Sequence, residues 1–361
     1  MNMSQTIDDH IENVPFSDIP MDDPFLDSLR DSYPTFDDWM RRKSAAGERA
    51  WISRNRKTGQ LQAMLYLKNE EDVDDSCEPI LRKPRVKIGT FKVDFDHHTS
   101  LGKRLLAIAL RHFAESGRPY VYVTMHDTPN TQSLMSMLQE YGFDRIGSKG
   151  EEQVWAKRRP IEMANDPHRT FPFIDPERDR AALLAIKPEY HALMFGDNRL
   201  RSEAGMPVED EIPTNTIEKV YLSGAPAAAR LEPGDRVVIY RTGDGMGPAE
   251  YRAVVSAVCT ITETRHIDTF GSRDDFLDHL KGRSVFRADE LDNFWGNKRF
   301  PWVISMLYNF PLKRRPTRHE LLDKHVIARN TRLVCERITA AQFKAILELG
   351  EADEGYAVDQ A

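Results

Sequence analysis

The chain has 361 residues, of which 40% are hydrophobic and 30% charged, and its formal net charge is −7. This length predicts two domains with separate cores, and the negative charge argues against a chain coated with positive charge for bulk nucleic-acid binding. No apolar run is long enough to span a bilayer and the N-terminus is acidic, so we expect a cytoplasmic protein with no membrane partner. Its cysteines, Cys77, Cys259 and Cys335, lack metal-ligand spacing, which predicts reduced thiols and no metal.

Residues 1–23 are rich in acids and poor in large apolar side chains, which predicts a disordered acidic tail. Two helices and a hairpin are expected next, because apolar residues first recur at helical spacing and then alternate around a Lys-Thr-Gly turn. The expected segments are helices from 24 and over 36–46, strands over 50–53 and 61–67, and a polar loop over 69–84.

The stretch 86–113 is the one around which this half of the chain is organised. Its β-branched and aromatic residues predict a strand over 87–93, and leucines at helical spacing predict a helix over 101–113. A polar turn joins them, and the helix starts with Gly102-Lys103-Arg104. Free N–H groups and the dipole of such a helix form an anion cradle, although an ordinary polar helix start is the alternative.

After this helix, Ser116-Gly117-Arg118-Pro119 predicts a helix end, and further strands and helices follow. A buried strand is expected over 120–125, a helix over 130–141 that ends at Gly142-Phe143, and short strands over 145–147 and 153–156.

This order of elements over residues 24–158 resembles the GCN5-related N-acetyltransferase (GNAT) fold. Its pyrophosphate turn, usually Gln/Arg-x-x-Gly-x-Gly/Ala, is matched by His97, Ser100 and Gly102, with one of the two glycines missing. The family's helix ending in Gly-Phe is matched at Gly142-Phe143, and the asparagine that often precedes it by Asn130. The resemblance implies acetyl-CoA as co-substrate, with these contacts: Phe91, Lys92, Val93, Ser100, Leu101, Gly102, Lys103, Arg104, Asn130 and Ser133. Helix capping is the alternative role for Asn130 and Ser133.

One departure concerns the general acid. Many family members carry a tyrosine four residues before the glycine, where this chain has Leu138, so the acid is unassigned. The nearest phenol, Tyr141, packs or faces solvent. Asp94, His126 and Asp127 stand at strand ends, where a general base would lie, and a solvated loop residue is the alternative for each of them. The candidate catalytic residues are therefore Asp94, His126 and Tyr141.

A proline-rich passage over 159–176 predicts a linker, and residues 351–361 predict a second acidic tail. Between them, residues 177–350 read as a mostly β domain with flanking helices. Its strands are expected over 219–222, 236–241 and 251–262, and its helices over 273–280 and 340–349.

Two phrases of this second domain, Ile186-Lys187-Pro188-Glu189-Tyr190 and Pro233-Gly234-Asp235, resemble the ASCH branch of the PUA-like barrels, over residues 180–340. The resemblance implies a small β-barrel that binds RNA or modified bases. Some ASCH proteins are amidohydrolases that use a Lys and a Thr in a Gly-x-Lys-Thr-like phrase. The corresponding run here is Gly196-Asp197-Asn198-Arg199, so that activity is not carried over.

The stretch 293–318 interleaves aromatic residues with cations, as single-stranded RNA recognition requires. The alternative is that Phe300, Trp302, Leu307 and Phe310 are core residues and the cations form a solvated face. The candidate RNA-binding residues are Lys187, Tyr190, Arg299, Trp302, Arg314 and Arg315.

Together these patterns predict an α+β protein: a GNAT-like mixed sheet flanked by helices, then a PUA-like small β-barrel with flanking helices. We expect an acetyl-CoA-dependent N-acetyltransferase in which an amine attacks the thioester directly and the second domain presents an RNA or RNA-associated substrate. One alternative is a non-catalytic RNA-binding or regulatory protein that retains the GNAT fold. The other is a protein acetyltransferase whose second domain binds partner proteins. The acceptor and the oligomeric state stay open.

Overall fold

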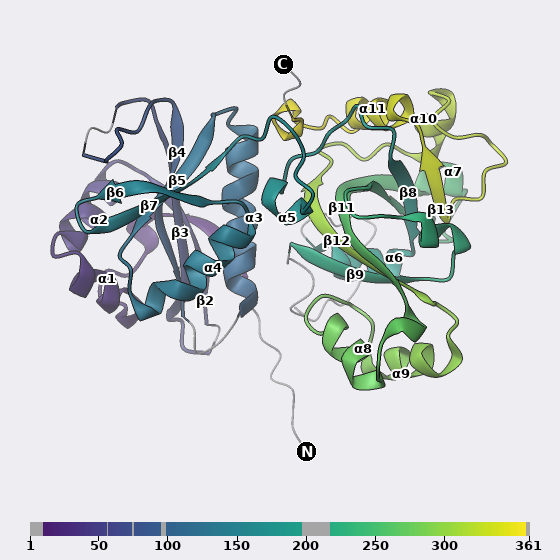
Figure 1. The fold of residues 1–361 in the computed structure, drawn as a ribbon, viewed down its shortest axis with the longest axis horizontal. Helices are drawn as coiled ribbons and strands as arrows, with labels where there is room; N and C mark the ends of the chain where they lie inside the picture. Colours follow the sequence, from purple (N-terminus) through teal and green to yellow (C-terminus); the bar gives the residue numbers. More distant parts are fainter. Residues whose placement is uncertain (1–9, 56, 74–75, 95–98, 197–216, 359–361) are drawn as a thin grey trace. The chain divides into compact units, whose positions relative to one another are not determined.

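The structure is a computed structural model that describes residues 10–55, 57–73, 76–94, 99–196 and 217–358 (Figure 1). The chain divides into two compact units, one of Met1–Gln139 with Phe143–Arg158 and the other of Glu140–Gly142 with Arg159–Ala361. Each unit combines helices with one mixed sheet, so the α+β class predicted from the sequence is confirmed.

The first unit contains a seven-stranded sheet in the order β1-β2-β3-β4-β5-β7-β6. Its neighbouring strands run antiparallel except for the parallel pair β4 and β5. The strands are β1 (Ile11–Pro15), β2 (Arg49–Arg54), β3 (Leu61–Glu70), β4 (Arg85–Val93), β5 (Tyr120–Met125), β6 (Asp144–Lys149) and β7 (Glu152–Arg158). The helices are η1 (Phe16–Asp18), η2 (Pro24–Leu26), α1 (Asp27–Ser32), α2 (Phe36–Ala45), α3 (Thr99–Glu115), η3 (Pro129–Thr131) and α4 (Gln132–Glu140).

The long helix α3 follows directly from its sequence. Leu101, Leu105, Ala109 and Phe113 recur at helical spacing, and each is at most 1% exposed. The helix packs across β3, β4 and β5, and Gly117, at a φ of +67°, ends it in a left-handed turn. The predicted strand and helix are therefore confirmed, with the strand starting at Arg85 and the helix at Thr99. The turn between them lies outside the described residues.

The N-terminal residues correct the prediction of a disordered tail over 1–23, which is wrong for residues 11–23. Ile11–Pro15 pairs with β2 as an edge strand. Phe16 and Ile19 are 2% and 3% exposed in the core beside α2. Val14 and Met21 pack against the same core, a placement that the composition alone does not reveal.

The second unit contains a six-stranded sheet in the order β13-β8-β10-β11-β12-β9. The predicted closed barrel is not shown, because the edge strands β13 and β9 are not paired with each other in the described part of the chain. The strands are β8 (Ala181–Ile186), β9 (Glu218–Ser223), β10 (Arg236–Arg241), β11 (Val254–His266), β12 (Trp302–Pro311) and β13 (Cys335–Ile338). The α-helices are α5 (Pro167–Thr170), α6 (Pro188–Met194), α7 (Ala249–Arg252), α8 (Arg273–Leu280), α9 (Ala288–Asn297), α10 (Arg318–Asp323) and α11 (Ala340–Leu349). Its 3-10 helices are η7 (Pro226–Arg230), η8 (Ile267–Thr269) and η9 (Glu354–Tyr356).

The predicted linker and C-terminal tail both belong to this second core. Phe171 and Phe173 are each 1% exposed, and the Ile174 backbone exchanges 2.9 Å hydrogen bonds with Tyr356 and Val358. The Tyr356 ring stacks on Phe310 with centroids 4.0 Å apart. The prolines of this segment shape a packed chain rather than a spacer, so the linker over 159–176 and the tail over 351–361 are wrong for their described residues.

Among the described residues, no helix combines the length and apolar character needed to cross a membrane.

Candidate functional site

The first unit is open between its two parallel strands. β4 and β5 pair only over three residues each, where 86–88 faces 121–123. Beyond that point β4 continues beside β3 as far as Val93, and β5 continues beside β7 as far as Met125. On the side toward β5, the later backbone groups of β4 therefore have no strand partner among the described residues. Such an edge can bind an extended chain through main-chain hydrogen bonds.

A β-bulge at Gly89 marks where the opening begins. Thr90 pairs with Tyr66 and Ile88 with Leu67, so Gly89 is the extra residue of β4. A Cβ atom at this position would lie 2.6 Å from Cδ1 of Tyr66, whose ring sits in the core. Because a bulge bends the strand that carries it, Gly89 both admits the Tyr66 ring and turns β4 away from β5.

The N-terminus of α3 follows the open part of β4 after residues 95–98, which lie outside the described residues and include His97 of the matched motif. Ser100, in the first turn, is 7% exposed, and its Oγ has no hydrogen-bond partner among the described residues. A buried hydroxyl without a partner beside free helix N–H groups fits an anionic ligand. The Ser100 hydroxyl is thus available as a donor, and the pyrophosphate cradle stays a prediction.

Gly102 is the next residue of the predicted cradle. A Cβ atom there would meet only Met137 of α4, at an ordinary contact distance of 3.7 Å. Packing within the described residues thus does not demand a glycine, and a close approach of a ligand to the backbone is a remaining reason for it. Lys103 and Arg104 follow it on α3 and are half-buried.

The other predicted cofactor contacts have different surroundings. Lys92 turns toward η2 and α1, where its Nζ donates to the Phe25 carbonyl and the Ser28 hydroxyl and lies 4.8 Å from the Phe25 ring centroid. Burial lowers the pKa of Lys92, and neighbouring aspartates oppose that shift. The Lys92 side chain is therefore engaged, and this residue can offer a ligand only its backbone groups. Leu101 is 1% exposed, so its side chain serves the core.

Asn130 and Ser133 are exposed and do not cap the helix that they precede or open. The cap is instead a reciprocal pair of threonines, Thr128 and Thr131. Thr131 also donates its hydroxyl to the His126 carbonyl at 2.7 Å. The capping alternative for Asn130 and Ser133 is wrong, and their contact with a cofactor stays a prediction.

Residues from three separate elements meet at the carboxyl end of β5. His126 directly follows the strand, and its ring contacts that of Tyr33, with centroids 5.5 Å apart. The Tyr33 hydroxyl, at the end of α1, donates to Glu152 Oε1 of β7 at 2.6 Å. Burial, followed by the hydrogen bond to Glu152, raises the pKa of Tyr33 well above its usual value. Because β4 and β5 are parallel, this group lies at the edge of the sheet toward which their opening widens.

Sequence reasoning found His126 but missed Tyr33 and Glu152. Tyr33 and Glu152 are separated by 119 positions and belong to no recognisable motif. A phenol at the end of an acidic helix and a glutamate after a Gly-Glu turn look like surface residues. Only the topology that brings the end of α1 to the start of β7 identifies them.

The two other candidate catalytic residues lie elsewhere. Asp94 follows β4, is half-buried, and its N–H donates to the Gln62 carbonyl at 2.8 Å. Tyr141 is fully buried, and burial raises its pKa far above the usual value. Of the alternatives for Tyr141, packing is therefore the one that the structure shows.

In the second unit, the predicted basic stretch is divided by β12. Arg299 and Trp302 stand at the start of this strand, whereas Arg314 and Arg315 follow its end. Ten residues of strand separate the two pairs by about 30 Å. Leu307 and Phe310, within the strand, are 0% and 1% exposed, as the core alternative predicts.

The two remaining RNA-binding candidates, Lys187 and Tyr190, lie far from β12 in the sequence. Lys187 is exposed before α6, and the Tyr190 hydroxyl donates to Glu290 at 2.9 Å. Arg314 forms an ion pair with Glu320 and donates to the Leu349 carbonyl at 3.2 Å. RNA binding by these side chains stays a prediction. The ASCH comparison at Asp197, Asn198 and Arg199 lies outside the described residues.

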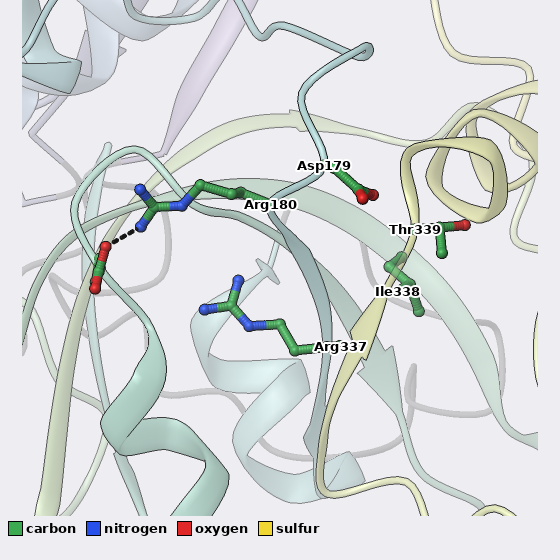
Figure 2. Close-up of a pocket in the computed structure, with 6 residues that line it drawn as sticks. Asp179, Arg180, Arg337, Ile338 and Thr339 are labelled. Atoms are coloured by element: carbon green, nitrogen blue, oxygen red, sulfur yellow. Dashed lines mark hydrogen bonds and ion pairs between the residues drawn. The ribbon is translucent and has the colours of Figure 1, made fainter.

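An open pocket of about 470 Å³ lies where β8 and β10 begin and β13 ends. Its lining residues are Asp179, Arg180, Glu232, Arg337, Ile338 and Thr339. Figure 2 shows the two arginine side chains extending in the same direction, with Arg180 paired to Glu232. Both also bind the fully buried Asp235, at 2.6 Å from Arg180 and 2.8 Å from Arg337. The charges of this pocket are thus satisfied internally, and Asp235 of the Pro-Gly-Asp phrase has a structural role.

No protein-family profile and no curated protein matches the chain. Solved structures similar to it include a GNAT-family acetyltransferase from Desulfovibrio desulfuricans, with 11% identity over 41% of this chain and 99% of that one, at a TM-score of 0.30. The PaiA N-acetyltransferase from Thermoplasma acidophilum, solved in complex with coenzyme A, shows 15% identity over 41% and 99%, at 0.27. A variant of an ASCH protein from Zymomonas mobilis shows 10% identity over 47% and 96%, at 0.32. The neighbours thus include both GNAT acetyltransferases and an ASCH protein, at similarities too low to assign this chain to a family or an activity.

Proposed function

We propose that the first unit is an acetyl-CoA-dependent N-acetyltransferase. The observation that carries this proposal is the opening between β4 and β5, which leads from the free edge of β4 to the N-terminus of α3. An extended pantetheine has amide groups that the β4 edge can pair, and its pyrophosphate is the anion that a helix N-terminus binds. One site thus offers both kinds of contact in the order in which acetyl-CoA needs them.

The buried Ser100 hydroxyl supports the fit of this ligand. It lacks a hydrogen-bond partner among the described residues, and such an unpaired donor costs about 1–3 kcal/mol unless a ligand satisfies it. Bound acetyl-CoA supplies an activated acyl group, and the residues of the chain hold an amine beside it. Positioning of this kind accounts for much of the acceleration of a bimolecular transfer, so Leu138 in place of a family tyrosine does not rule out turnover.

Calorimetric titration of the full chain with acetyl-CoA tests the proposal, followed by transfer to a panel of amines monitored as release of free thiol. We expect saturable binding, with dephospho-CoA and CoA competing for the same site, and turnover with at least one amine. An absence of binding would overturn the proposal. Binding without transfer to any amine would instead favour the regulatory alternative, in which the fold is retained without catalysis.

For the second unit we propose no more than the sequence predicts, namely recognition of an RNA or RNA-associated substrate. Retention of single-stranded RNA by the full chain, measured against salt, is the test. Binding through phosphates weakens steeply as the salt concentration rises. Retention that does not change with salt would contradict a role for the candidate lysine and arginine side chains.

A further inference from the structure

We propose that His126 accepts the proton of the acceptor amine, and that Tyr33 and Glu152 position its ring. This inference rests on the acetyltransferase function proposed above and deepens it by assigning the general base. A protonated amine cannot attack a thioester, so a group at the wide end of the opening has to remove one proton before the new bond forms.

His126 is placed for this task by its backbone and by its neighbours. It directly follows β5, at the edge where β4 and β5 have separated, and the Thr131 hydroxyl fixes its carbonyl. The side chain is half-buried, and neither ring nitrogen has a hydrogen-bond partner among the described residues. An imidazole that is oriented but unpaired is available to an incoming amine.

Tyr33 and Glu152 form the support of this ring. The Tyr33 ring lies against His126, with centroids 5.5 Å apart and planes inclined by 37°. The hydroxyl of Tyr33 is held by Glu152 at 2.6 Å, which ties the end of α1 to the start of β7. The ring contact and the hydrogen bond to Glu152 together restrict where the His126 imidazole can lie.

The other acids at this edge are less available. Asp127, next to His126, has both carboxylate oxygens engaged, by the Gln132 amide at 2.6 Å and the Gln153 amide at 2.8 Å. Glu152 already accepts from Tyr33. Asp94 lies on the opposite strand of the opening, after β4. Of these titratable groups, Tyr33 contacts the His126 ring, Glu152 holds Tyr33, and Asp127 is the next residue in the chain, held by Gln132 and Gln153.

The proposed step balances as follows. The acceptor ammonium gives one proton to the His126 imidazole, and the resulting amine attacks the thioester carbonyl. The C–N bond forms as the C–S bond breaks. The second proton of the nitrogen leaves with the thiolate as free thiol, and His126 returns its proton to water.

Two acceptors that differ in protonation separate this role from a structural one. An alkylamine such as n-butylamine is protonated at neutral pH and needs a base, whereas hydroxylamine is largely unprotonated and does not. For His126→Gln we expect transfer to n-butylamine to fall by about 100-fold or more, and transfer to hydroxylamine to change by less than about threefold. Raising the pH should restore the n-butylamine rate of the variant. Tyr33→Phe should shift the pH profile of that rate without changing acetyl-CoA affinity.

Asp127→Asn is the matched control, because it alters a neighbouring side chain that the proposed step does not use, and it should leave the ratio of the two rates unchanged. Circular dichroism and acetyl-CoA titration of each variant report on folding. Equal losses with both acceptors, or no loss with either, would overturn the assignment of His126 while leaving the acetyltransferase intact. A wild-type chain that transfers to no amine of the panel would overturn the proposed function, and this inference with it.

Discussion

Ser100 shows how a single buried hydroxyl bears on function. In the free protein its Oγ has no hydrogen-bond partner among the described residues, although the side chain is only 7% exposed. A polar group left in this state is a cost to the fold that a ligand can remove. Removing the Ser100 hydroxyl should therefore affect the stability of the free protein and the affinity for the cofactor in opposite directions.

For Ser100→Ala we expect unchanged or slightly higher stability and weaker binding of acetyl-CoA, by about 10-fold or more. The alanine removes an unsatisfied donor from the free protein but deletes a bond to a charged phosphate, worth about 1.5–3 kcal/mol, in the complex. Urea unfolding and calorimetric titration measure the two effects. Ser136→Ala, at an exposed position of α4, is the control and should affect neither. Destabilisation by Ser100→Ala with no loss of affinity would show that the hydroxyl serves only the fold.

His279 gives the second unit a dependence on pH. It lies in α8 with its Nε2 3.0 Å from the Ser305 hydroxyl and its ring against Phe270. Burial lowers the pKa of His279 to about 4, and Arg283 and Arg265 act in the same direction. Since the unfolded value is about 6.5, the unfolded chain binds more protons between these two values.

The free energy of unfolding should therefore fall as the pH drops from 6.5 toward 4, by at most about 1.4 kcal/mol per pH unit from this residue. Its contribution is fully present above pH 6.5, where both states are neutral. Urea unfolding at several pH values checks this. His279→Gln should flatten the slope, whereas the same substitution at the exposed His10 should not. An unchanged slope in His279→Gln would assign the pH dependence to other groups.

At the scale of elements, the opening between β4 and β5 depends on one bulge. Position 89 requires glycine, because the Cβ atom of any other residue would lie 2.6 Å from Cδ1 of the Tyr66 ring. The ring itself cannot move easily, since Phe16 and Trp39 contact it edge-on at 5.2 and 5.6 Å. The bulge and the aromatic core of the first unit are thus coupled.

Gly89→Ala should destabilise the first unit by about 1–3 kcal/mol, the usual cost of overpacking a core, and should weaken acetyl-CoA binding by distorting the β4 edge. Gly102→Ala is the control for stability. Its Cβ atom meets Met137 at an ordinary 3.7 Å, so the helix should be unaffected or gain up to about 1 kcal/mol. Chemical denaturation compares the two variants. A Gly89→Ala protein as stable as the wild type would mean that Tyr66 can repack.

At the scale of the molecule, each unit has a core that includes a terminal segment. Phe16 belongs to the core beside β2, β3 and α2, and Tyr356 stacks on Phe310 in the second unit. A fragment that starts after the proline-rich passage or stops at residue 350 would therefore expose apolar surface. RNA-binding experiments need the full chain for this reason.

We expect Phe16→Ala and Tyr356→Ala each to cost about 3–5 kcal/mol, the loss typical of large aromatic truncations in a core, but in different units. Hydrogen exchange read by mass spectrometry should show lost protection in β2 and β3 for Phe16→Ala, and in β11 and β12 for Tyr356→Ala. Ser17→Ala, exposed beside Phe16, is the control. Equal loss across both sheets from either variant would show that the two units unfold as one.

Much of the secondary structure could be predicted from the sequence. The strands at Tyr120–Met125 and Arg236–Arg241 and the helices at Arg273–Leu280 and Ala340–Leu349 have the predicted bounds. The apolar period of a segment reports which of its faces is buried, and that information is local. The sequence also predicted Ser100 as a site residue, because it lies between the predicted strand and helix and matches a turn motif of the resembled family.

The rest was decided by contacts between distant segments. Tyr33 meets Glu152 across 119 positions, and the opening between β4 and β5 exists because their pairing stops at Ile88. Long-range strand pairing also divides the basic stretch at β12, and contacts between distant segments place Phe16 and Tyr356 in the two cores. Sequence by itself determined the periodic elements, because their pattern lies within each segment. Only the tertiary structure decided which elements meet, since residues far apart in the chain become neighbours only when the sheet order and register are set.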